Sequence, residues 1–258
     1  MPNDTTGSAA TDLLCISPHT DDAEIGFGGA LRLFAERGHR VWICDLTRGE
    51  LGSNATSEER WAEAAAASGE LGIAGRVQLD LPDGFVSAEQ PDQVAAVTAL
   101  IRLLRPRWVV TAPDPRRHPD HVATPALVAK ACFMARLARY RVAVSGAVWW
   151  PEPSAEREAA ERWEVEAQFA VCGDDDRPSL IVDVSETWEA KRRALACFAS
   201  QFQRREGRRP THINDESFLE KIERRGRAWG YRAGVTYGEA LTSSAVPLLN
   251  DLPRESWR

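Results

Sequence analysis

Short apolar runs alternate with amphipathic segments over the first half of this 258-residue chain, and no other feature constrains the fold as strongly. Apolar runs bounded by turn residues predict strands, whereas apolar residues recurring every three or four positions predict helices. Strands are expected at 13–17, 41–47, 77–82 and 108–112, and helices at 28–38, 58–72, 91–105 and 121–140. This alternation indicates βαβ units and a mostly parallel sheet.

The pattern changes after residue 140, where strands follow one another without long helices between them. Further strands are expected at 142–150, 165–171 and 179–184, and closing helices at 186–202 and 215–230. We therefore predict a single α/β domain over 13–242, with a Rossmann-like, doubly wound sheet of strand order 3-2-1-4-5. Residues 143–242 are its C-terminal β/α elaboration, with a basic loop at 203–214. The ends, 1–12 and 243–258, are expected to be tails, the first of them disordered or frayed.

Composition excludes several classes of function. The net charge of −6 does not favour nucleic-acid binding, which needs a basic surface. No apolar stretch reaches the ~18 residues of a membrane span, and the polar start lacks a signal-peptide core. The five cysteines are scattered and form no close pair, which favours a reducing cytoplasm over a disulfide framework.

Two clusters of His and Asp follow the first and fourth predicted strands. They are His19-Thr20-Asp21-Asp22 and His118-Pro119-Asp120-His121. In the predicted order these two strands are neighbours, and the crevice at their carboxyl ends is where such sheets bind ligands. Each cluster alone also fits a helix cap or a solvated turn. Their shared position favours one site built from both.

Imidazole and carboxylate together suit zinc, with some room for iron, cobalt or nickel. A catalytic zinc site needs three protein ligands and one open position, and His19, Asp22 and His121 can supply the three. Asp21 is then the natural general base. His118 can stabilise an oxyanion or protonate a leaving amine, and Asp120 can orient His118 or a ligand.

At these residues the sequence resembles the LmbE-like, or PIG-L-like, zinc N-deacetylases. Their first motif, His-Pro-Asp-Asp and then commonly one residue and Glu, corresponds to 19–24, and their His-x-Asp-His motif corresponds to 118–121. The resemblance implies the same three metal ligands, with Asp21 as base, and His118 and Asp120 assisting at the oxyanion or leaving group. It also implies a homo-oligomer that acts on a small amino-sugar conjugate.

One branch is especially similar, the N-acetylglucosaminyl-malate deacetylases of bacillithiol biosynthesis, with matching stretches from about 13 to 241. The resemblance implies that Arg60 holds the substrate, and that Ser53 and Asn54 belong to the loop that approaches the sugar. It also implies that 203–214 lies near the entrance of the site. Thr20 departs from the usual proline. The arginines of the basic loop either favour an anionic substrate or form a solvated charge run; they are Arg204, Arg205, Arg208 and Arg209.

Two other functions stay open. The first is a related amidase that cleaves a thiol S-conjugate or another sugar conjugate in a specialised pathway. The second is a non-catalytic nucleotide-binding module, which the glycine spacing disfavours. Gly26-Phe27-Gly28-Gly29 does not match the G-x-G-x-x-G fingerprint and lies beyond the first cluster.

Overall fold

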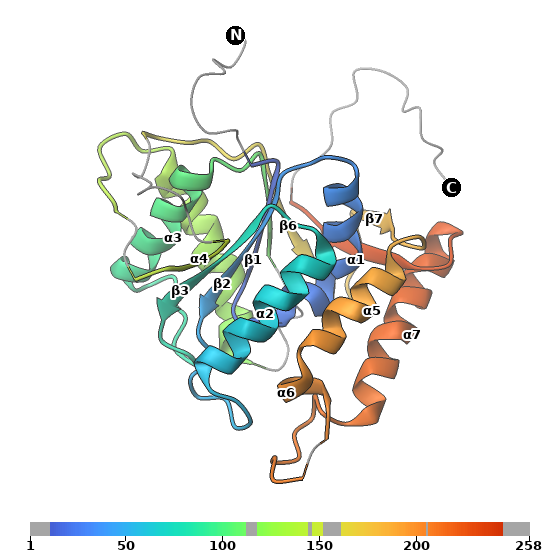
Figure 1. Cartoon of the computed structure of the whole chain (residues 1–258). Helices are drawn as coiled ribbons and strands as arrows, with labels where there is room; N and C mark the ends of the chain where they lie inside the picture. Colours follow the sequence, from blue (N-terminus) through green and yellow to red (C-terminus); the bar gives the residue numbers. More distant parts are fainter. Residues whose placement is uncertain (1–10, 112–117, 144–145, 152–160, 205, 245–258) are drawn as a thin grey trace.

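One eight-stranded sheet organises the molecule in the computed structural model, which describes residues 11–111, 118–143, 146–151, 161–204 and 206–244 (Figure 1). The strands are β1 (Leu13–Ser17), β2 (Val41–Thr47), β3 (Gly75–Leu81), β4 (Trp108–Thr111), β5 (Val148–Trp150), β6 (Ala167–Val171), β7 (Leu180–Asp183) and β8 (Gly238–Thr242). The helices are α1 (Asp22–Glu36), α2 (Ser57–Leu71), α3 (Pro91–Leu104), α4 (Pro119–Ala135), α5 (Trp188–Cys197), α6 (Ala199–Phe202) and α7 (Glu216–Ala233).

The strand order is β5-β3-β2-β1-β4-β6-β8-β7, so the predicted 3-2-1-4 core is present and its strands are parallel. The prediction that strand five follows strand four is wrong. β5 pairs antiparallel with β3 at the far edge of the sheet, and β6 is the parallel neighbour of β4. Trp149 of β5 packs edge-on against Trp42 of β2, with 5.9 Å between ring centroids. β5 thereby covers an edge that β3 would otherwise expose.

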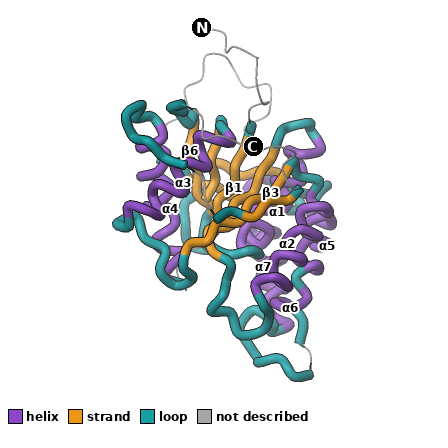
Figure 2. Tube along the Cα trace, turned by 60° about the vertical axis from the view of Figure 1, so that its left-hand side comes forward, coloured by secondary structure: helices purple, strands orange, loops and turns teal. Residues whose placement is uncertain are grey.

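Helices cover both faces of the sheet, as Figures 1 and 2 show from two directions. Alternate residues of a strand point to opposite faces. Leu13 and Cys15 of β1 therefore join the core formed with α1, α2 and α5, whereas Leu14 and Ile16 join the core formed with α3 and α4. Every residue of β1 is buried, which explains its apolar run from Leu13 to Ile16.

Helix boundaries differ from the prediction in three helices. α1 begins at Asp22, well before the expected start at residue 28, because a first helical turn precedes a kink at Phe27. α4 begins at Pro119, and the expected helix over 186–202 is divided into α5 and α6 at Phe198. The early start of α1 places Asp22 at a helix N-terminus.

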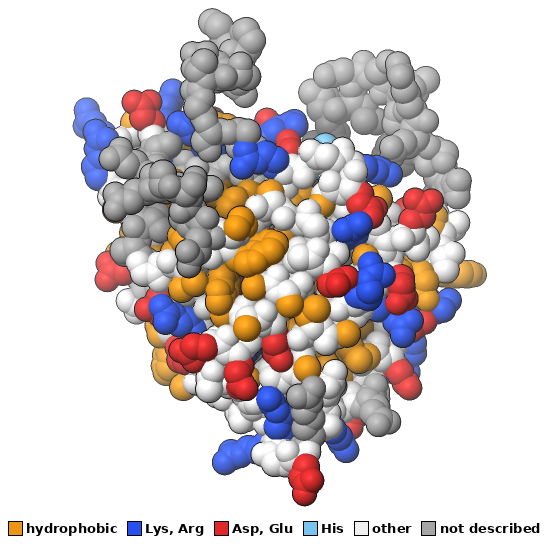
Figure 3. Space-filling view, viewed as in Figure 1, with side chains coloured by type: hydrophobic (Ala, Val, Ile, Leu, Met, Phe, Trp, Pro, Cys, Tyr) orange, Lys and Arg blue, Asp and Glu red, His pale blue; other side chains and the backbone are white. Residues whose placement is uncertain are grey.

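The sequence also led to expectations about the ends of the chain and its surface. Residues 1–10 and 245–258, which make up most of the predicted tails, lie outside the described residues. Thr11 and Asp12 are held by backbone hydrogen bonds to Leu104 and Arg40. No described helix combines the length and hydropathy needed to cross a bilayer. Charged side chains of both signs intermix on the face shown in Figure 3.

Candidate active site

The two predicted clusters meet at the carboxyl ends of β1 and β4. These strands are adjacent and parallel, with Ile16 opposite Thr111, so the segments that follow them leave the sheet at the same edge. His19 lies in the loop after β1, and Asp22 opens α1. His121 lies in the first turn of α4, two residues after its start. The prediction that strands one and four are neighbours is confirmed.

His19, Asp22 and His121 bring three potential ligand atoms together. The His19 Nδ1 atom is 3.1 Å from Asp22 Oδ2, and His121 Nε2 is 3.3 Å from both of these atoms. A tetrahedral ion with bonds of about 2.0–2.1 Å separates its ligands by roughly 3.3 Å. The residues therefore fit a metal of zinc's size. Among the described residues, they form a His/Asp group whose ligand atoms lie close enough together to hold an ion.

The charge state of Asp22 suits a ligand. Burial pushes the pKa of its carboxyl up, but the adjacent His121 and His19 pull it further down, to well below the usual range. The carboxylate therefore stays ionised at neutral pH. Its Oδ2 atom also accepts the backbone N–H of His19 at 3.0 Å, which fixes the loop between the two residues.

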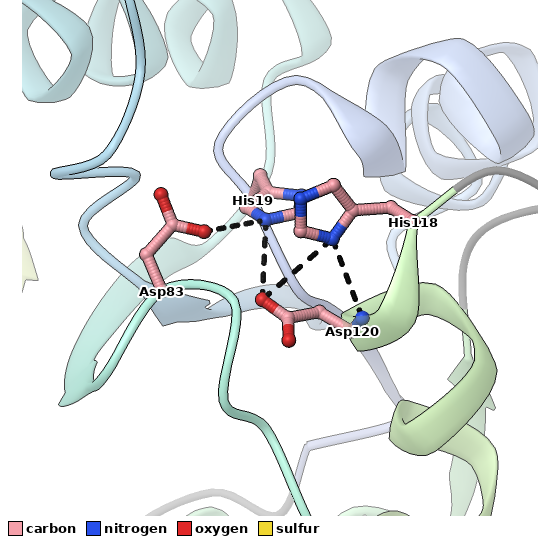
Figure 4. Close-up of side chains that lie close together, drawn as sticks. All are labelled: His19, Asp83, His118 and Asp120. Carbon is pink, nitrogen blue, oxygen red and sulfur yellow. Dashed lines mark hydrogen bonds and ion pairs between the residues drawn. The ribbon is translucent and has the colours of Figure 1, made fainter.

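The other ring nitrogen of His19 faces two buried carboxylates (Figure 4). His19 Nε2 is 3.2 Å from Asp83 Oδ1 and 3.5 Å from Asp120 Oδ2. A metal-binding imidazole commonly donates its second N–H to a carboxylate, which fixes the ring and raises its basicity. Asp120 was predicted to orient either His118 or a ligand. Its Oδ2 atom lies closer to His19 Nε2, at 3.5 Å, than to His118 Nδ1, at 3.8 Å, which favours the second role.

Asp120 is itself held rigidly. It is fully buried, and its two oxygens accept the backbone N–H groups of Gly84 at 2.7 Å and Val86 at 3.0 Å. Gly84 has φ of +81°, a conformation that glycine adopts without strain. The turn after β3 therefore positions a carboxylate that belongs to α4.

Sequence reasoning missed Asp83 as a site residue. It follows β3, the strand next but one to β1, and its Oδ2 atom accepts the backbone N–H of Leu51 at 3.1 Å. The signal was an Asp directly after the end of a third parallel strand. Asp83 ties the loop after β2 to the His19 ring.

Replacing Asp83 by Asn should weaken metal binding about tenfold, because His19 loses the charged acceptor that raises its basicity. Competition with a chromogenic chelator measures the affinity. Asp80→Asn is the matched control, since the Asp80 carboxylate is exposed and pairs with Arg48 on the surface. Equal affinities for the two variants would contradict an orienting role for Asp83.

Asp21 lies beside Arg60 in the same region. Its Oδ1 atom is 3.9 Å from Arg60 Nη2, and only 4% of the residue is exposed. Burial raises the pKa of Asp21 above its usual value, and the Arg60 charge opposes the rise. A base with a raised pKa accepts a proton more readily near neutral pH.

Arg60 is engaged by the protein itself. Its Nε atom donates to Thr20 Oγ1 at 3.1 Å, and Nη1 donates to the Gly49 carbonyl at 3.3 Å. A Cβ at Gly49 would lie 2.0 Å from Arg60 Nη1, so only glycine allows this approach. Thr20, which stands where the resembled family has proline, supplies an acceptor that proline lacks. Whether Arg60 also holds substrate stays a prediction.

His118 is the N-cap of α4. Its Nδ1 atom accepts the backbone N–H of Asp120 at 3.3 Å, so in the neutral ring the proton sits on Nε2. Burial and the charge of the nearby His19 lower the pKa of His118. A neutral imidazole with its proton on Nε2 is a hydrogen-bond donor, which matches the predicted oxyanion role.

A cavity of about 420 Å³ joins these groups. It is lined by His19, Asp21, Asp22, Ile25, Leu51, Gly52, Arg60, Asp83, Gly84, His118, His121, Gln201, His212, Ile213, Phe218, Lys221, Ile222 and Arg225. Its size suits a small-molecule ligand. One wall of the cavity is formed by α7 residues within 218–225, and we call it the α7 wall. It was not predicted, although apolar and basic residues three and four positions apart there mark one face of a helix.

The predicted loop residues lie outside this lining. Ser53 is exposed, and the Asn54 side chain holds the basic loop by two hydrogen bonds to the backbone of Arg209, at 2.8 and 2.9 Å. Arg204 pairs with Asp215, and Arg208 donates to the Asn54 carbonyl. Arg205 is not among the described residues. A role for Ser53 and Asn54 in substrate binding stays a prediction.

Known proteins share both sequence and fold with this chain. The PIG-L family model, described as GlcNAc-PI de-N-acetylase, matches residues 14–132. A 1D-myo-inositol 2-acetamido-2-deoxy-alpha-D-glucopyranoside deacetylase of Rhodococcus erythropolis is 27% identical, over 75% of this chain and 82% of the relative. The diacetylchitobiose deacetylase of Thermococcus kodakarensis is 27% identical, over 74% and 70% of the two chains.

A solved structure extends the similarity to almost the whole molecule. The conserved protein TT1542 of Thermus thermophilus is 33% identical, with a TM-score of 0.78 over 95% of this chain and 100% of that one. The family match covers β1 to α4, the part of the fold that carries His19, Asp22 and His121. This chain belongs to the PIG-L family of de-N-acetylases.

Proposed function

We propose that this protein is a metal-dependent hydrolase that removes the N-acetyl group from a small glucosaminyl conjugate, such as N-acetylglucosaminyl-malate. One observation carries the proposal. Three ligand atoms lie within 3.1–3.3 Å of one another, in the same cavity as Asp21 and His118. The named relatives support the substrate class, since each is named for deacetylating an acetamido sugar. Zinc as the metal, a cytoplasmic location and a homo-oligomer belong to the same proposal.

His19, Asp22 and His121 would hold the metal, which would supply Lewis acidity and lower the pKa of water at the site. Asp21 accepts a proton from the attacking water and passes it to the amine nitrogen as the C–N bond breaks, because its buried carboxylate lines the cavity and its pKa is raised. His118 donates its Nε2–H to the oxygen of the acetamide carbonyl as negative charge develops there. Asp83 and Asp120 keep the His19 ring in place.

A deacetylation assay with defined substrates tests this function. Purified protein is incubated with N-acetylglucosaminyl-malate, the corresponding inositol glycoside, diacetylchitobiose and an acylated thiol S-conjugate, and released acetate and free amine are measured. We expect amine release from at least one glucosaminyl conjugate. A chelator should abolish the activity, and added zinc should restore it.

The same assay also shows which results would favour one of the two alternative functions. Cleavage of the S-conjugate with no release of acetate from any acetamido sugar would replace the deacetylase by a related amidase. No turnover of any substrate, together with nucleotide binding and a stability that ignores chelators, would favour the non-catalytic module.

A further inference from the structure

The inner face of α7 carries two cations into the active-site cavity. Phe218, Lys221, Ile222 and Arg225 are three or four positions apart and therefore share one side of the helix. All four line the cavity that contains the proposed metal ligands. Phe218 and Ile222 give this wall an apolar stripe, and Lys221 and Arg225 give it a basic one.

The Lys and Arg side chains of the described cavity lining differ in what holds them. Arg60 faces Asp21, Thr20 and the Gly49 carbonyl, so its hydrogen bonds are directed inward. Among the residues that the structure describes, Lys221 and Arg225 form ion pairs with one carboxylate: Lys221 Nζ is 3.3 Å from Asp174 Oδ2, and Arg225 Nη1 is 3.8 Å from Asp174 Oδ1. One carboxylate cannot neutralise two cations, so this pair retains positive charge toward the cavity.

Lys221 and Arg225 also line a second cavity, of about 440 Å³, which therefore adjoins the first. Its remaining lining residues are Asp174, Arg224, Ala228, Trp229 and Arg232. Four cationic side chains accompany one carboxylate there, counting the shared pair. The positive charge is concentrated where the two cavities join, away from the acidic groups around His19.

We propose that Lys221 and Arg225 bind an anionic group, a carboxylate or a phosphate, on the part of the substrate outside the acetamido sugar. The inference rests on the proposed function and names the substrate class for the same site. Arg and Lys both form charge-assisted hydrogen bonds to these anions, Arg through two parallel N–H groups. The acetamide occupies the metal end, and the anionic aglycone reaches the α7 wall.

Matched substrates test this assignment. Three conjugates carry the same 2-acetamido-2-deoxy-glucosyl group with a neutral methyl, a malate or a glycerol-phosphate aglycone. Lys221→Gln and Arg225→Gln should each raise KM for an anionic conjugate about tenfold, the loss expected for one charge-assisted contact. KM for the methyl glycoside should stay within about twofold, and kcat should change little for all three. The malate and glycerol-phosphate arms show which anion is preferred.

Arg227→Gln is the matched control, because it removes the same charge from the same helix, but Arg227 pairs with Glu223 at the surface and lines neither cavity. It should leave all three KM values nearly unchanged, and Lys221→Arg should retain binding of the anion. Equal effects of Lys221→Gln on neutral and anionic conjugates, or none on either, would overturn the proposal. Absence of deacetylation of every conjugate by the unaltered protein would instead reject the proposed function.

Discussion

Asp21→Asn should keep the metal bound while kcat for deacetylation falls by roughly 10²–10⁴-fold, the usual contribution of a positioned general base. Asn cannot accept the proton that Asp21 takes from water, but it keeps nearly the same shape. Asp21 is not one of the three residues proposed to bind the metal. Since burial raises the pKa of Asp21, the charged form is not favoured by its surroundings, and the thermal midpoint should not fall.

His121→Ala is the contrasting variant, because it removes His121 Nε2, one of the three atoms proposed to bind the metal. It should lose both metal and activity. Metal content by elemental analysis and kcat for the methyl glycoside are measured for both variants. If Asp21→Asn lost the metal as completely as His121→Ala, the division between base and ligand would be wrong.

The sequence predicted the central part of the fold because that part depends on local patterns. β1 to β4 are short, buried and separated by helices, so chain order and βαβ handedness leave few arrangements. The same reasoning brought His19 near His121, although about a hundred residues separate them. Asp22 was expected near His19 from spacing alone, and the early start of α1 agrees with that expectation.

Features that depend on packing between distant segments could not be predicted in this way. The β5 edge is set by Trp149 packing on Trp42, which no local pattern encodes. The contact between Asp83 and His19 depends on the turn after β3, and the α7 wall depends on how the C-terminal helix docks. Asn54 matched a substrate-loop pattern, yet the structure uses its side chain to hold Arg209.

A buried arginine, Arg76, holds the loop that carries His19 and Asp21. Arg76 of β3 is fully buried, and its Nε and Nη2 atoms donate to the two oxygens of Asp45 at 2.6 and 2.8 Å. Its Nη1 atom donates to Glu24 at 2.6 Å, and Nη2 also donates to the Thr20 carbonyl at 2.7 Å. Arg76 therefore links β2, α1 and the loop that carries His19 and Asp21.

Arg76→Leu should lower the free energy of unfolding by about 3–5 kcal/mol, because Asp45 and Glu24 would remain buried without their counter-charge. Arg32→Leu is the control; it breaks an ion pair with Glu36 on the surface and should cost about 1 kcal/mol or less. Urea denaturation measures both. A loss for Arg76→Leu no larger than that for Arg32→Leu would show that the buried network does not stabilise the fold.

The loss of unfolding free energy caused by Arg76→Leu should depend on pH. Burial raises the pKa of Asp45, and Arg76 counteracts the rise. Without Arg76 the folded-state pKa of Asp45 moves further above its unfolded value, so the folded variant binds more protons than the unfolded chain. Its stability must then fall as pH rises through that interval. The deficit of Arg76→Leu should therefore be larger at pH 8 than at pH 5, and a deficit independent of pH would mean that Asp45 is not left uncompensated.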